Sequence, residues 1–165
     1  MLAVIRVRGT TGLTPAARKS TELMRLHHIN HMVIVKESET LKGMLQSAKD
    51  YITWGEIDRE TLTEVLKTRA LLEGRKNLTE EYLKEKMGIE SFTDLSQKLI
   101  DGEIKYKDIP GIIPVLRMHP PKGGYEYIRI QYNKKGTLGY RGEAINDLIL
   151  KMLIPGVKVN GTNQN

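Results

Sequence analysis

The first 58 residues alternate between two spacings of apolar side chains, and this alternation limits the folds open to the chain. Short runs in which apolar and polar side chains alternate, or in which apolar side chains follow one another, are typical of β-strands, and they occur at residues 2–8, 31–35 and 51–54. Residues 15–27 and 40–50 carry apolar side chains three or four positions apart, as amphipathic helices do. The order β-α-β-α-β predicts an α+β fold, in which two helices cover one face of a small three-stranded sheet.

The next part of the chain reads as helices. Asp58, Thr79 and Ser91 are side chains that cap helix amino termini, and each precedes an amphipathic stretch. They predict helices over 59–72, over a short stretch that Gly88 ends, and over 92–100. Residues 59–110 are therefore expected to be a helical insertion.

Residues 111–153 are more basic and richer in glycine. Residues 125–132 alternate well enough to predict a further strand, and a helix is expected after Gly142. Together, residues 59–153 are expected to form a mainly helical extension of the first unit. Residues 154–165 are expected to be a mobile tail.

Positive charge is concentrated at the two ends of the sequence. Residues 1–58 hold 8 basic and 6 acidic side chains, residues 59–116 hold 10 and 11, and residues 117–165 hold 8 and 3. If the fold brings the two ends together, they would form one basic surface suited to a polyanion. A mildly basic protein without such a partner would show the same net charge of +6.

Several chemistries find no support in the sequence. The chain has no cysteine, which excludes disulfides, thiol catalysis and thiolate metal sites, and fits a reducing cytoplasm. No phosphate-binding loop of known spacing and no G-x-S-x-G motif occurs. No apolar run approaches a membrane span. We expect a soluble intracellular protein with no catalytic residues, no cofactor and no membrane partner.

The histidines leave three interpretations open. His27 and His31 are four residues apart, but they fall on either side of a predicted helix end, and no further side chain completes a metal shell. His27 and His28 at a helix carboxyl terminus can simply interact favourably with the helix dipole. They can also contact RNA. The sequence favours the structural interpretation over RNA contact, and RNA contact over a metal.

Three loops combine glycine with basic residues: PKGG at 121–124, NKKG at 133–136 and GYRG at 139–142. Glycine lets backbone N–H groups approach a phosphate, and Tyr140 can stack on a base. One such loop is an ordinary hairpin tip. Three of them within a basic segment favour nucleic-acid contact over solvated turns.

At this point the sequence resembles a known family. The run MLAVIRVRGTTGLTPAARKSTELMRLHHINHMVIVKE at 1–37 and LKGMLQSAKDYITWGEI at 41–57 resemble the core of the ribosomal protein family numbered thirty in bacteria and archaea and seven in eukaryotes. MGIESFTDL at 87–95, PKGG at 121–124 and YRGEAINDL at 140–148 resemble the extension of its archaeal and eukaryotic members. The chain lacks the long basic amino-terminal arm of the eukaryotic form, so the resemblance is to the archaeal type.

The resemblance implies a ferredoxin-like core over residues 1–58 and the extension over 59–153. It also implies a place in the large ribosomal subunit, in contact with its rRNA near the 5S rRNA and with neighbouring ribosomal proteins. It implies no catalysis and no small-molecule substrate.

Charge placement and resemblance indicate the same rRNA-binding candidates, which form two groups. The first group follows the first strand and the two helices: Arg6, Arg8, Thr10, Thr11, Arg18, Lys19, Arg25, His27, His28, Lys42 and Lys49. The second lies near the carboxyl terminus: Lys122, Gly123, Gly124, Lys134, Lys135, Tyr140 and Arg141. Such contacts act chiefly by neutralising phosphates, because duplex RNA hides its base edges.

Two other classes of function remain possible from the sequence. A small β-α-β-α-β unit can also serve as a small-molecule-sensing regulatory module, which would need an apolar pocket. An enzyme would need titratable groups that converge in one cleft, and the motifs give no sign of such a cluster.

Overall fold

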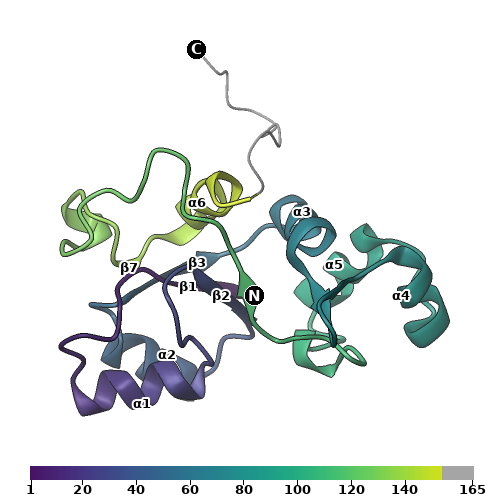
Figure 1. Ribbon diagram of the computed structural model, residues 1–165, viewed down its shortest axis with the longest axis horizontal. Coiled ribbons are helices and arrows are strands. Elements are labelled where there is room, and N and C mark those ends of the chain that lie inside the picture. Colours follow the sequence, from purple (N-terminus) through teal and green to yellow (C-terminus); the bar gives the residue numbers. More distant parts are fainter. Residues whose placement is uncertain (154–165) are drawn as a thin grey trace.

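A central sheet of five strands organises the molecule (Figure 1), for which a computed structural model describes residues 1–153. The strands lie in the order β6 (Leu116–Arg117), β2 (His31–Val35), β1 (Leu2–Arg6), β3 (Ile52–Glu56) and β7 (Gly139–Tyr140). The middle three strands confirm the predicted α+β core, and β1 pairs antiparallel with both neighbours. The predicted tail at 154–165 lies outside the described residues.

Both outer strands come from the extension, which the sequence pattern did not predict. β6 pairs antiparallel with β2 at His31 and Met32, and β7 pairs parallel with β3 at Thr53 and Trp54. Each outer strand has only two residues. The extension therefore completes the sheet of the first 58 residues at both edges.

Two helices cover one face of the sheet, as predicted. α1 (Pro15–Leu23) starts at Thr14, whose side chain accepts a hydrogen bond from the Ala17 amide, and α2 (Glu39–Ser47) starts at Ser38 in the same way. α1 ends four residues before the predicted boundary, because Arg25 adopts a left-handed backbone conformation (φ 61°) that stops a helix. The helices enclose an apolar cluster with the sheet: Leu2, Val4, Ala17, Met24, Leu26, Val33, Leu41, Leu45, Ala48, Tyr51 and Ile52.

The extension covers the opposite face of the sheet. α3 (Arg59–Arg69), α4 (Glu80–Met87) and α5 (Phe92–Ile100) start at the predicted caps Asp58, Thr79 and Ser91, and α6 (Ile145–Lys151) follows the last strand. Figure 1 shows α6 above the sheet and α3–α5 to its right, with α1 and α2 below. Ala3 and Ile5 of β1 join Leu62, Leu66, Leu95, Ile145 and Ile149 in one buried cluster. β1 is thus buried on both faces.

Smaller elements connect these parts. Leu71–Leu72 (β4) and Lys76–Asn77 (β5) form a short hairpin at the place where the sequence predicted the end of the 59–72 helix. Three single turns of 3₁₀ helix follow, η1 (Tyr106–Asp108), η2 (Tyr132–Lys134) and η3 (Gly142–Ala144). Within residues 1–153, no helix is both long and apolar enough to cross a membrane.

The strand predicted at 125–132 is wrong. This stretch is irregular and folds back on itself, with the amides of Thr137 and Leu138 both donating to the Ile130 carbonyl (2.9 and 3.1 Å). A strand needs a neighbouring strand to pair with, and the edge of β3 is already occupied by β7. We name residues 120–141 the C-terminal loop.

Candidate nucleic-acid interface

Arg6 ends β1 with its charge inside the protein. The residue is 2% exposed, and its guanidinium donates hydrogen bonds to the carbonyls of Leu26 (2.6 Å), Arg8 (2.8 Å) and Gly9 (3.2 Å). Burial lowers the pKa of Arg6. The sequence-based expectation of a phosphate contact needs correction at this residue, because its donors are used to hold the loop after β1.

The next arginine leaves its charge at the surface. Arg8 donates to the Asp50 carbonyl (3.1 Å) and lies over the Tyr51 ring, 5.0 Å from its centre. The Tyr51 hydroxyl donates to the Gly12 carbonyl (2.8 Å), and this bond ties the loop that contains the exposed Thr10 and Thr11 to the start of β3. Arg8 and this loop are therefore held against the turn between α2 and β3.

The C-terminal loop contacts the same turn. The Gln131 side-chain amide donates to the Asp50 carboxylate (3.1 Å) and to the Lys49 carbonyl (3.5 Å). Lys134 and Lys135, both exposed, lie in and directly after η2. In Figure 1 the purple loop after β1 and the yellow-green part of the C-terminal loop lie at the same end of the molecule. Arg8 and Lys49 from the first predicted group, and Lys134 and Lys135 from the second, thus lie on segments that the contacts of Asp50 bring together.

Arg141 is half-buried and anchors the C-terminal loop. Its guanidinium donates to the Thr53 hydroxyl (2.8 Å) and the Thr137 carbonyl (2.6 Å), and lies over the Tyr132 ring. Burial lowers the pKa of Arg141. Two of its nitrogens are therefore committed within the protein, much as those of Arg6 are.

Tyr140 presents an exposed ring at the edge of the sheet. Its hydroxyl donates to the Glu56 carboxylate (2.7 Å), and this hydrogen bond is the main reason that the pKa of Tyr140 is raised. The ring also lies against Trp54, with 6.4 Å between ring centres. The two contacts fix the orientation of the ring, which is what a base-stacking residue needs.

Sequence reasoning missed the apolar side chains of the C-terminal loop. Of the seven large apolar residues exposed in the described chain, five lie in this loop: Tyr127, Ile128, Ile130, Tyr132 and Tyr140. Exposed apolar residues that gather in one place mark interaction surfaces. The signal was present as apolar residues between glycine-rich turns, but it was interpreted as a strand.

The other predicted residues are spread more widely. Arg18 and Lys19 are exposed on the first turns of α1, next to Leu13 and Pro15, and Arg25 is exposed beyond the other end of that helix. Lys122, Gly123 and Gly124 form an exposed turn that the Lys122 amide ties to the Lys151 carbonyl, so they lie beside the end of α6.

Lys42 differs from these, because acids offset its charge. Its amine lies 3.6 Å from the Glu37 carboxylate and 3.4 Å from that of Glu39. The hydrogen bond that the Lys42 amine donates to Glu39, together with the charge of both carboxylates, raises the pKa of Lys42. Of the predicted cations, Lys42 is thus poorly suited to a phosphate.

His27 and His28 are exposed just after α1. The His28 ring meets the His31 ring edge-on, with centres 5.1 Å apart. Within residues 1–153, no three side chains of the metal-ligating types gather closely enough to hold an ion.

Comparison with known proteins gives one family. The sequence pattern of the family described as "Ribosomal protein L30p/L7e" matches residues 2–52. The chain is 56% identical to large ribosomal subunit protein uL30 of Thermoplasma acidophilum over 165 residues, all of both chains. It is 49% identical to that of Thermofilum pendens, covering 91% of this chain and 97% of the relative, and 41% identical to that of Archaeoglobus fulgidus, covering 92% and 99%.

Proposed function

The chain belongs to the ribosomal protein L30p/L7e family, and we propose that it binds large-subunit rRNA with the end of the molecule where Arg8, Lys49 and the C-terminal loop meet. It is a structural constituent of the cytoplasmic large ribosomal subunit, in a family that is non-enzymatic. None of the relatives supports the alternative of a small-molecule-sensing regulatory module.

The convergence at Asp50 is the observation that carries this proposal. Arg8 and Gln131, 123 positions apart in the sequence, both donate hydrogen bonds to Asp50. The exposed cations Lys49, Lys134 and Lys135 lie next to these contacts in the sequence. Cations gathered on one surface neutralise successive phosphates and release their counterions, which is the main source of affinity for RNA.

Within this surface the basic residues have two roles. Arg8, Arg18 and Lys19 face outward and contact phosphates, together with the backbone of the loop at Thr10 and Thr11. Arg6 and Arg141 act as positioning residues, because their donors hold the two loops in place. Preorganised loops reduce the entropy that must be lost on binding.

The aromatic side chains add a second kind of contact. Tyr140 and Tyr127 present exposed rings (54% and 71%) beside the basic residues. Sequence-specific RNA recognition relies on unpaired bases that stack on aromatic rings. The C-terminal loop therefore binds a bulged or looped rRNA segment, while the cations bind the flanking backbone.

The position within the subunit is also a proposal. The family resemblance supports a place near the 5S rRNA and contacts with neighbouring ribosomal proteins. It also supports residues 1–58 as the rRNA-binding core and 59–153 as the extension. A photoreactive residue at position 127 in purified large subunits is expected to cross-link to rRNA within or adjoining the 5S region.

Sedimentation of cell lysate at low and high salt tests the function. We expect the protein in the large subunit at one copy per particle, released only by high salt. Recovery as a free monomer or dimer would refute the proposal. Arg18→Ala with Lys19→Ala is expected to weaken rRNA binding, whereas Lys84→Ala with Lys86→Ala on α4, equally exposed, is expected to leave it unchanged.

A further inference from the structure

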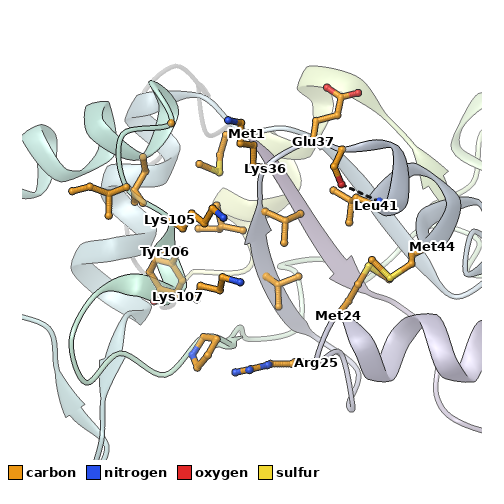
Figure 2. A pocket seen from close by; sticks show the side chains of 18 of the residues that line it. Met1, Met24, Arg25, Lys36, Glu37, Leu41, Met44, Lys105, Tyr106 and Lys107 are labelled. Carbon is orange, nitrogen blue, oxygen red and sulfur yellow. Dashed lines mark hydrogen bonds between the residues drawn. The ribbon is translucent and has the colours of Figure 1, made fainter.

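A groove separates β2 from the segment that follows α5 (Figure 2), outside the proposed rRNA surface. It encloses about 490 Å³. One wall is formed by Leu23 at the end of α1, by Met24 and Arg25 directly after it, and by β2 and the start of α2. The other is formed by Leu99 and by residues 102 and 104–107. Lys36 reaches across it, with its amine 3.6 Å from where a Cβ on Gly102 would stand.

The outer edge of β2 is only half covered. The Met118 amide donates to the Asn30 carbonyl (3.1 Å), and Met32 pairs with Leu116. Because the backbone groups of alternate strand residues point to the same edge, Ile34 also presents its N–H and C=O to this edge. The register places Ile34 opposite residue 114, beyond the last pair.

Residue 114 is a proline, so it has no N–H to offer. Within residues 1–153, no hydrogen bond from the Ile34 amide or to its carbonyl crosses this edge. The backbone edge of β2 at Ile34 therefore faces the groove, where an added strand can complete the pairing.

The groove has an apolar interior and a basic rim. Leu23, Met24, Val35, Leu41, Met44, Ile104 and Pro114 line it. Arg25, Lys36, Lys105 and Lys107 are exposed around it, against the single acid Glu37. Figure 2 shows Lys105 and Lys107 on one wall and Arg25 on the other. An occupant must therefore bring apolar side chains and negative charge.

We propose that this groove binds an extended, acidic and apolar segment of a neighbouring protein of the large subunit, which pairs with β2 at Ile34 as an added strand. Alternate side chains of the segment enter the apolar interior, and carboxylates between them meet the basic rim. The inference rests on residence in the subunit, but not on the rRNA contacts proposed above.

A protein segment fits the groove better than RNA does. Unpaired bases need exposed aromatic faces, and the one aromatic residue that lines the groove, Tyr106, is 4% exposed. A free strand edge matches the regular spacing of peptide N–H and C=O groups, which a nucleic acid lacks. The basic rim alone would suit either partner.

Photo-cross-linking in large subunits purified at low salt tests this. p-Benzoylphenylalanine replaces Leu23, which is 63% exposed and lines the groove. We expect an adduct to one ribosomal protein, at a segment with alternating apolar residues and carboxylates. Lys105→Glu with Lys107→Glu should reduce this adduct at least about fivefold by reversing the rim charge. Lys84→Glu with Lys86→Glu on α4 is the matched control and should leave it unchanged.

Strand addition has a second readout. Amide hydrogen exchange at Ile34 should be slower in the subunit than in the free chain, and Lys105→Glu with Lys107→Glu should restore fast exchange. If that pair unfolds the protein, Lys107→Glu alone replaces it. The inference would be overturned if adducts formed only with rRNA, if no adduct formed, or if the yield of the protein adduct did not change when the rim charges were reversed. Loss of the unmodified chain from the subunit would instead refute the proposed function.

Discussion

The two halves of the extension attach to the same sheet by different means. The helical half, α3 to α5, is regular and apolar inside, and nearly balanced in charge over residues 59–116. The C-terminal loop is irregular and basic, and it leaves large apolar side chains exposed. Side-chain hydrogen bonds from Gln131, Arg141 and Tyr140 link it to Asp50, Thr53 and Glu56.

The difference separates stability from binding. Apolar burial stabilises the helical half without reference to any partner. The loop buries less and keeps its cations at the surface, and polar contacts of defined geometry hold its shape. Substitutions in the helical half should therefore change folding, and those in the loop should change rRNA binding.

The largest expected effect is in the helical half. Leu66→Ala removes a fully buried side chain of α3 from the apolar cluster. The free energy of unfolding should fall by about 2–5 kcal/mol, as measured by urea denaturation. The rRNA affinity of the folded fraction should be unchanged. If the folded variant also bound rRNA more weakly, the separation between residues for stability and residues for binding would be contradicted.

An intermediate effect is expected from Gly136→Ala in the loop. A Cβ at this position would lie 2.0 Å from the Ile130 carbonyl oxygen, so the loop must shift. We expect a loss of about 1–3 kcal/mol in the free energy of unfolding and a clear drop in rRNA affinity. The matched control is Gly43→Ala in α2, where a Cβ meets nothing within 4 Å, and it should preserve both quantities or slightly stabilise. Equal behaviour of the two variants would contradict the structure of the loop.

Lys134→Gln with Lys135→Gln should leave the free energy of unfolding within about 0.5 kcal/mol, since both side chains are exposed. Each lost phosphate contact reduces the slope of log affinity against log salt by about 0.7–0.9. A filter-binding series in salt should thus show a slope shallower by about 1.4–1.8. An unchanged slope would remove these lysines from the interface.

The smallest expected effect lies where β6 joins the sheet. His31 of β2 pairs with Arg117 of β6. The pKa of His31 is lowered from its usual value of 6.5, mainly by burial and then by the nearby charges of His28, Arg117, His27 and Arg6. The unfolded chain binds a proton at His31 more readily than the folded chain does. The stability that comes from keeping His31 neutral is therefore fully present above pH 6.5 and is lost as the pH falls from 6.5 through the lower pKa of the folded state. His31→Gln should make the free energy of unfolding depend less on pH between 7.5 and 5.5. An identical pH profile for variant and parent would contradict the assigned shift.

Local patterns predicted much of the fold, because caps and apolar periods act over a few residues. Asp58, Thr79 and Ser91 start helices where the sequence places them. The prediction of a strand at 125–132 was wrong, since a strand also depends on a partner strand that can be distant in the sequence. Periodicity likewise gave no sign that the two-residue strands β6 and β7 complete the sheet.

The candidate site was less predictable from sequence. Charge counts placed cations at both ends of the chain, but the contact of Gln131 with Asp50 joins residues 81 positions apart. For Arg6 the signal was available: alternation puts it on the same face as Leu2 and Val4, which are buried. An arginine in register with a buried face is a candidate for an internal anchor.

The use of the extension for both outer strands has a consequence for the order of events during synthesis. When residue 58 has emerged, β1, β2 and β3 exist, but both edges and one face of their sheet are uncovered. The strand that covers β3 ends at Tyr140, so at typical elongation rates of about 5–20 residues per second the nascent sheet waits about 4–16 s for completion. During that interval its unpaired edges are open to pairing with other chains, and the Asp50 junction cannot form until residue 131 has emerged.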